Sequence, residues 1–203
     1  TAVPSCSHNS YVRLNCASKD CTEQQDLKEN RLNKLIVKKA AVLGAGVMGA
    51  QIAAHLANAN VPVVLFDLPA REGDKNGVVK KALDGLKKLD PARLSIKGKL
   101  KFIDAANYDE HLPLLAECDL VIEAIAERMD WKNDLYAKIA PHLGANAIIA
   151  SNTSGLSMNA LAQGLPENVR PRFCGIHFFN PPRYMHLVEI IGTQSTDGST
   201  LDA

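Results

Sequence analysis

The chain has 203 residues, of which 46% are hydrophobic and 22% charged, a composition typical of a globular protein with a buried core. Its 23 Lys and Arg nearly balance its 22 Asp and Glu, so the net charge of +1 gives no general attraction to nucleic acid or to an anionic membrane. The five cysteines are an odd number without metal-site spacing, which favours a reducing compartment and no metal. No apolar run approaches the ~20 residues that span a bilayer, and the first residues lack the apolar core of a secretory signal. We therefore expect a cytoplasmic protein with no membrane or nucleic-acid partner.

Residues 1–36 contain no sustained hydrophobic period, and we interpret them as a tail or linker with one helical turn near residues 27–35. Residues 1–20 are rich in Ser and poor in acids, as in transit peptides, but they contain few arginines. From residue 37 to residue 203, short apolar runs alternate with helical patterns. This alternation predicts one α/β domain with a parallel sheet.

The apolar runs predict strands at residues 40–43, 61–66, 100–103, 120–125, 147–150, 173–179 and 186–191. The helical patterns between them cover residues 48–59, 77–89, 131–139 and 156–165. In the first helix, Met48, Ile52, Leu56 and Ala59 form one apolar stripe, and small residues such as Ala53 allow close packing. The strands at the C-terminal end are expected to extend a doubly wound, mostly parallel sheet.

A glycine-rich turn stands directly after the first strand and opens the first helix, with the sequence Gly44-Ala45-Gly46-Val47-Met48-Gly49. In a Rossmann-type fold this context gives each glycine a role. Gly44 permits the tight turn, Gly46 lets the backbone approach a pyrophosphate, and Gly49 allows close helix-to-strand packing. The free amides at the helix start then hold the phosphate. We predict that residues 44–49 bind a dinucleotide, the alternative being a glycine-rich turn that binds nothing.

Asp67 ends the second strand, 18 positions beyond Gly49. A carboxylate at this position accepts hydrogen bonds from the adenosine ribose hydroxyls and repels a 2′-phosphate. The cofactor is therefore predicted to be NAD. Arg71, just downstream, keeps NADP open as the alternative.

Several polar residues follow the later strands at the carboxyl edge of the sheet, where ligands bind in such folds. The hydroxyl-rich segment at residues 150–155 either caps the next helix or contacts the ligand, and the spacing leaves both open. Glu123 and Glu127 flank the end of the strand at 120–125, as capping or solvent-facing charges or as cofactor contacts. Lys132 either reaches the same ligand or extends into solvent.

An apolar strand delivers His177 and Asn180 toward its carboxyl end, and the next strand carries a lone acid, Glu189. A histidine among apolar residues is more often part of a core than of a catalytic site. If the two strands are neighbours, however, Glu189 accepts a hydrogen bond from one imidazole nitrogen, which fixes the tautomer and favours the protonated form. The other nitrogen is then free to exchange a proton with a substrate, which is a pair suited to general acid/base catalysis.

Together these motifs resemble the NAD-binding domain of 3-hydroxyacyl-CoA dehydrogenases over residues 38–191, and are most similar to the large bacterial branch in which the dehydrogenase is fused to an enoyl-CoA hydratase. The His-Phe-Phe-Asn-Pro segment at 177–181, with an acid twelve residues after the histidine, is the most specific part of the likeness. The resemblance implies NAD-dependent oxidation of a 3-hydroxyacyl-CoA to a 3-ketoacyl-CoA in fatty acid beta-oxidation.

The resemblance also implies roles for single residues. His177 would be the catalytic acid/base and Glu189 its partner, while Ser154 and Asn180 would position the substrate and the nicotinamide. Glu127 and Lys132 match family positions that contact the cofactor. The basic helix after the second strand lies near CoA in the family, which would give Lys88 a contact there.

Family enzymes have a helical domain after this one that completes the acyl-CoA site and forms the dimer, whereas this sequence stops at Ala203. We therefore expect these residues to bind NAD but to turn over acyl-CoA poorly by themselves, with a dimer only in the full-length protein. Two alternatives stay open. One is a 3-hydroxyisobutyrate-type dehydrogenase, which relies on a catalytic lysine from a later helical segment, and the other is an NAD-binding module without catalysis.

Overall fold

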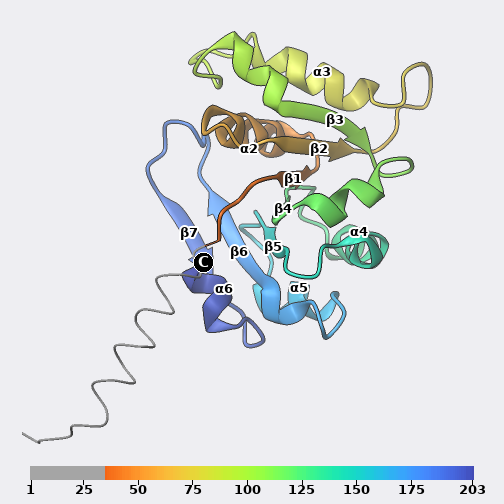
Figure 1. Ribbon diagram of the computed structural model, residues 1–203, viewed down its shortest axis with the longest axis vertical. Coiled ribbons are helices and arrows are strands. Elements are labelled where there is room, and N and C mark those ends of the chain that lie inside the picture. Colours follow the sequence, from red (N-terminus) through yellow and green to blue (C-terminus); the bar gives the residue numbers. More distant parts are fainter. Residues whose placement is uncertain (1–34) are drawn as a thin grey trace, which may run out of the picture. The chain divides into compact units, whose positions relative to one another are not determined.

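A computed structural model describes residues 35–203, so most of the expected tail at 1–36 and the helical turn at 27–35 lie outside the described residues. The described residues contain one sheet with the strand order β3-β2-β1-β4-β5-β6-β7 (Figure 1). The strands are β1 (Ala40–Leu43), β2 (Val63–Asp67), β3 (Ile103–Asn107), β4 (Leu120–Glu123), β5 (Ile148–Ser151), β6 (Phe173–Phe178) and β7 (Val188–Ile191). All pairs are parallel except β6 with β7. The predicted Rossmann-type sheet with an additional C-terminal strand is confirmed.

Helices cover both faces of this sheet. The cluster that contains α2 (Val47–Asn58) and α3 (Gly77–Leu86) buries Ala40 and Val42 of β1. The cluster that contains α4 (Met129–Ile139) and α5 (Met158–Gln163) buries Ala41 and Leu43 instead. Alternate residues of a strand point to opposite faces, so β1 is apolar throughout because both of its faces are covered. The chain order reverses between β1 and β4, which is where such folds bind nucleotides.

The short helical segments lie between or after these elements. They are the 3₁₀ helices η1 (Lys97–Phe102), η2 (Leu112–Glu117), η3 (Ala140–His142) and η4 (Arg170–Arg172), and the helix α6 (Gly198–Asp202). Among residues 35–203, no helix combines the length and the hydropathy that crossing a bilayer requires. The same residues contain no cluster of three or more His, Cys, Asp or Glu placed to bind a metal.

The packing of α2 differs in part from the predicted stripe. Its fully buried residues are mostly small, namely Gly49, Ala50, Ala53, Ala54 and Ala57, together with Ile52 and Gln51. Met48 and Leu56 are only half-buried, and Ala59 is exposed beyond the last turn. Small side chains face the sheet because the helix starts directly at the glycine turn and lies close to β1 and β2.

The largest departures from the predicted bounds are in β3 and α3. Residues 97–102 form η1, and the third strand begins only at Ile103, where a strand at 100–103 was expected. The sequence of β3, Ile-Asp-Ala-Ala-Asn, carries a weak strand signal, and its pairing with β2 at the sheet edge decides its conformation. The helix expected at 77–89 ends at Leu86, so Lys88 lies exposed in the turn that follows.

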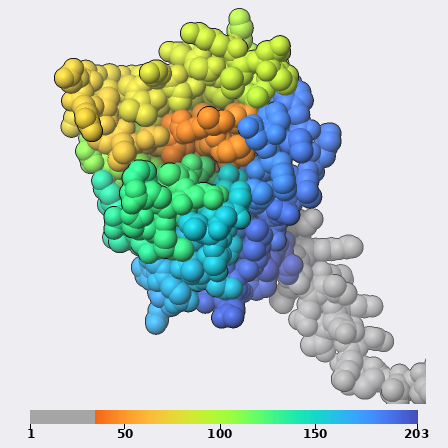
Figure 2. Space-filling view, turned by 180° about the vertical axis from the view of Figure 1, so that it is seen from behind, coloured from red at the N-terminus to blue at the C-terminus, as the bar shows by residue number. Residues whose placement is uncertain are grey.

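The loop between β6 and β7 lies against the segment between α3 and η1. Arg183 donates hydrogen bonds to the carbonyl oxygens of Ala92 and Leu94, each at 2.7 Å, and the hydroxyl of Tyr184 donates to Ala92 at the same distance. Figure 2 shows this contact between the blue and the yellow-green segments, with α2 in orange beside it. The loop that follows His177 is therefore attached to the α3 side of the sheet.

Candidate active site

The glycine turn joins β1 to α2 in a conformation that requires two of its glycines. Gly44 has φ +103°, and a Cβ there would lie 2.9 Å from the carbonyl oxygen of Ala124. A Cβ on Gly49 would lie 1.8 Å from the carbonyl oxygen of Gly44, so only glycine fits there. Gly46 differs, because a Cβ on it would meet nothing within 4 Å. As the N-cap of α2, Gly46 also leaves the first amides of the helix without a side-chain partner.

Asp67 lies beside this turn at the end of β2. Its Oδ2 accepts a hydrogen bond from the backbone N–H of Ala45 at 2.6 Å, and its Oδ1 accepts one from Leu68 at 2.7 Å. Each carboxylate oxygen can accept more than one hydrogen bond, so Asp67 holds the turn and keeps acceptor capacity for ribose hydroxyls. The sequence predicted the second role and missed the first.

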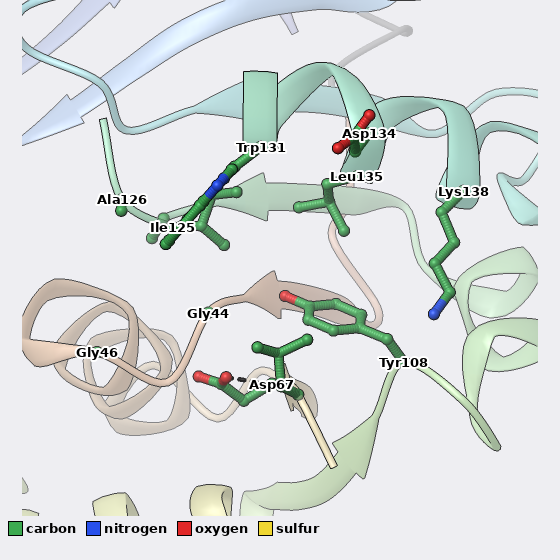
Figure 3. Close-up of a pocket in the computed structure, with 12 residues that line it drawn as sticks. Gly44, Gly46, Asp67, Tyr108, Ile125, Ala126, Trp131, Asp134, Leu135 and Lys138 are labelled. Carbon is green, nitrogen blue, oxygen red and sulfur yellow. Dashed lines mark hydrogen bonds between the residues drawn. The ribbon is translucent and has the colours of Figure 1, made fainter. Parts of the chain in front are cut away.

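A cavity of about 470 Å³ opens at this edge of the sheet and is lined by Gly44, Gly46 and Asp67. Figure 3 shows Asp67 and Tyr108 on one side of it and residues of α4 on the other. The lining residues that sequence reasoning missed are Leu68, Tyr108, Ala124, Ile125, Ala126, Trp131, Asp134, Leu135 and Lys138. Their common signal was position, because they directly follow the carboxyl ends of β2, β3 and β4 or lie on α4. The open side of Gly46, the free helix amides and Asp67 fit a dinucleotide.

His177 lies directly opposite Glu189 in the antiparallel pairing of β6 with β7. The His177 Nδ1 is 2.8 Å from Glu189 Oε2, and its Nε2 is 2.8 Å from the Ser154 Oγ. The His177 side chain is 17% exposed, so one edge of the ring remains accessible. The Phe179 ring packs beside the imidazole, with the ring centroids 4.7 Å apart. The structure thus brings together three of the four residues predicted to be catalytic.

The loop that carries Ser154 is held by the carboxylate of Glu127. Glu127 Oε1 accepts hydrogen bonds from the backbone N–H groups of Ser154 at 2.8 Å and Gly155 at 3.2 Å. These bonds, led by the one from Ser154, lower the pKa of Glu127 below its usual value. A Cβ on Gly155 would lie 2.6 Å from Glu127 Oε2, so a side chain there would displace the carboxylate from this position. Cofactor contact by Glu127 stays a prediction.

Glu123 and Lys132 form a buried ion pair, which corrects two expectations. Lys132 Nζ is 2.5 Å from Glu123 Oε1, and the two side chains are 1% and 0% exposed. Glu123 also accepts hydrogen bonds from Tyr136 at 3.0 Å and Ser151 at 2.7 Å. Glu123 therefore neither caps a helix nor faces solvent, and Lys132 does not extend into solvent. The sequence missed this pairing because Glu123 is on β4 and Lys132 on α4, and only their packing brings the charges together.

The hydroxyl-rich segment does not cap α5. That helix begins at Met158, and its cap is Ser157, whose Oγ accepts from the N–H of Ala160. The buried Ser151 bonds Glu123 instead, and Ser154 bonds His177.

Another contact fixes the end of β6. Asn152 Oδ1 accepts a hydrogen bond from the N–H of Phe178 at 2.8 Å, which ties the end of β6 to the β5 loop. Asn180 lies exposed just beyond that end. Its role, like the CoA contact of Lys88, stays a prediction.

The comparisons with known proteins agree with this geometry. The family described as 3-hydroxyacyl-CoA dehydrogenase, NAD binding domain, matches residues 39–203. The chain belongs to this family.

A Rickettsia felis relative, provisionally named a fatty acid oxidation complex trifunctional enzyme, is 49% identical over 156 residues, which are 76% of this chain and 22% of that protein. A Deinococcus radiodurans relative, provisionally named a 3-hydroxyacyl-CoA dehydrogenase, is 45% identical over 163 residues, which are 79% of this chain and 47% of that protein.

A solved structure of 3-hydroxybutyryl-CoA dehydrogenase from Escherichia coli is also similar to this member of the family. It is 31% identical, with a TM-score of 0.69, over 83% of this chain and 35% of that chain. The chain thus spans less than half the length of each of these three relatives. Membership of the family confirms the predicted cofactor, NAD.

Proposed function

We propose that this domain takes part in the NAD-dependent oxidation of a 3-hydroxyacyl-CoA to a 3-ketoacyl-CoA, with His177 as the catalytic base. The observation that carries the proposal is the hydrogen-bonded series Ser154–His177–Glu189 at the carboxyl end of β6. An imidazole that is held by a carboxylate on one nitrogen and faces a hydroxyl on the other is suited to accept a hydroxyl proton.

The partner of each nitrogen assigns the tautomer. The ionised Glu189 carboxylate can only accept, so in the neutral imidazole Nδ1 carries the proton and donates it to Glu189 Oε2. Nε2 is then the basic nitrogen, and the Ser154 hydroxyl donates to it at 2.8 Å. A substrate hydroxyl that replaces Ser154 as the donor to Nε2 loses its proton to His177, and the nearby Glu189 carboxylate stabilises the imidazolium that forms.

The remaining residues orient the reactants. NAD, when bound, supplies the acceptor for the hydrogen that leaves C3 of the substrate as hydride. The glycine turn and Asp67 bind its phosphates and adenosine ribose, and Ser154 and Asn180 position the substrate and the nicotinamide. A contact of Glu127 with the cofactor and one of Lys88 with CoA complete the proposal, together with a role in fatty acid beta-oxidation, a dimer of the full-length protein and a cytoplasmic location. The predicted cofactor contact of Lys132 is not part of it, because that side chain is buried against Glu123.

The test replaces His177 by Gln in the native polypeptide that contains these residues. We expect kcat for 3-hydroxyacyl-CoA oxidation, followed by NADH absorbance, to fall by about 100-fold to 10,000-fold, because the proton acceptor is lost. The dissociation constant for NAD should not change. The matched control is His186→Gln, an exposed histidine in the β6–β7 segment. A His177→Gln variant that keeps the activity of the control would contradict the proposal.

A further inference from the structure

Tyr108 is a rigidly held residue in the wall of the cavity, directly after β3. Its N–H donates to the carbonyl oxygen of Asp67 at 3.2 Å. Its ring stacks on Phe66, with the ring centroids 6.0 Å apart and an interplanar angle of 14°. The whole residue is only 5% exposed. The backbone bond and the stacking together fix where its hydroxyl points.

The Tyr108 hydroxyl is buried and has no partner among residues 35–203 at the distance and angle of a hydrogen bond, although the nearby Gly44 backbone opposes part of the rise in its pKa. Tyr108 lines the cavity, and Figure 3 shows its hydroxyl pointing toward Gly44, on the side of Asp67. The other buried tyrosine, Tyr136, makes a useful contrast, because its hydroxyl donates to Glu123 at 3.0 Å. Buried hydroxyls are nearly always bonded, so an unbonded one that faces a cavity indicates a ligand atom as its partner.

The surroundings of this hydroxyl define the kind of partner. Burial, and after it the charges of Asp67 and Glu123, raise the pKa of Tyr108 far above its ordinary value, so the hydroxyl keeps its proton. It can therefore donate to an oxygen of a ligand. The same cavity is lined by Gly44, Gly46 and Asp67, which belong to the phosphate and adenosine ribose side of the cofactor site.

We propose that the Tyr108 hydroxyl donates a hydrogen bond to an oxygen of the ADP half of bound NAD, which makes Tyr108 a cofactor-binding residue. This inference rests on the binding of NAD at the glycine turn. It adds a side-chain donor to the backbone amides of the glycine turn, and it places that donor on the strand β3 side, where the sequence has no recognisable motif.

The experiment measures the binding of NAD, ADP-ribose and nicotinamide mononucleotide to the native chain and to Tyr108→Phe by calorimetry. The variant should bind NAD and ADP-ribose about fivefold more weakly, as expected for one lost hydrogen bond, and by the same factor for both. Its affinity for nicotinamide mononucleotide should equal that of the native chain. The matched control is Tyr184→Phe, which removes a hydroxyl that bonds Ala92 outside the cavity and should bind all three ligands normally.

Thermal unfolding without ligand separates this role from a structural one. Tyr108→Phe should keep the Tm of the native chain, because the hydroxyl has no partner in the described residues, whereas Tyr136→Phe should lower it. Unchanged affinity of Tyr108→Phe for NAD and ADP-ribose would overturn the inference and leave the proposed function intact. A lower Tm together with the weaker binding, or an effect on the mononucleotide alone, would also overturn it. Failure of the native chain to bind NAD would overturn both proposals.

Discussion

The cofactor turn and the catalytic edge of the sheet are built in different ways. The turn lies within residues 44–49 and works through its backbone, because glycines at fixed positions create the conformation and leave helix amides free. The catalytic edge works through side chains from β4 to β7, and its key contacts join residues that are far apart in sequence. A site made of backbone follows from local sequence, while a site made of side chains depends on strand register and on the anchoring of loops.

Carboxylates hold hydrogen-bond donors in both regions, and the carboxylate at the turn also faces the cavity. At the turn, Asp67 bonds a backbone N–H of the turn and still faces the cavity. At the catalytic edge, Glu123, Glu127 and Glu189 each bond a group that they hold in place, namely Ser151, the Ser154 backbone and the His177 ring. The catalytic edge should therefore be more sensitive to the loss of a charge than the turn, and the turn more sensitive to added bulk.

The largest stability effect should come from Glu123→Gln. This change leaves the Lys132 ammonium buried without its counter-charge, which costs about 3 to 5 kcal/mol of the free energy of unfolding. The matched control is Glu117→Gln, which breaks an ion pair with Lys39 in which the Glu117 side chain is 62% exposed, and should cost at most about 1 kcal/mol. Denaturant unfolding measures both. Equal losses of unfolding free energy in the two variants would mean that the buried ion pair contributes no more to stability than the exposed one.

Alanine at two glycines of the turn should have smaller effects, mainly on stability at one position and mainly on NAD binding at the other. Gly49→Ala forces a Cβ against the Gly44 carbonyl and should lower the free energy of unfolding by about 1 to 3 kcal/mol or more. Gly46→Ala meets no protein atom, so its cost should be limited to the poorer N-cap that alanine provides, about 1 kcal/mol or less. The methyl group that Gly46→Ala adds faces the cofactor cavity and should weaken NAD binding about tenfold. Normal NAD binding by Gly46→Ala would show that the turn does not approach the pyrophosphate.

The smallest effect concerns the pH dependence of the Ser154 loop. The folded pKa of Glu127 is lowered from 4.5 by the N–H groups that it accepts, so its stabilisation of the loop is complete above 4.5 and is lost as the pH falls through the lower folded value. The amide proton shifts of Ser154 and Gly155 should therefore titrate together with a midpoint below 4.5. Glu127→Gln should abolish that titration. A midpoint at 4.5 or above would mean that the carboxylate does not hold the loop.

The features that could be predicted from the sequence also differ between the turn and the catalytic edge. The glycine turn, Asp67 and the doubly wound, mostly parallel sheet were predictable because they depend on short spacing and on the pattern of βα units. The pairing of His177 with Glu189 was predictable only on the condition that their strands are neighbours, which the register of β6 and β7 fulfils. Strand β3 was misplaced because Ile-Asp-Ala-Ala-Asn has little intrinsic strand signal, and its neighbour in the sheet decides its conformation.

By itself, the sequence determined the α/β class, the position of the nucleotide turn and the residue types available for proton transfer, since these depend on local spacing and chemistry. Only the tertiary structure decided the partners of the charges. It buried Lys132 against Glu123, assigned Glu127 to the Ser154 loop and left the Tyr108 hydroxyl without a partner in the cavity. The physical reason is that burial and hydrogen bonding of a side chain depend on the elements packed around it, which its neighbours in the sequence do not specify.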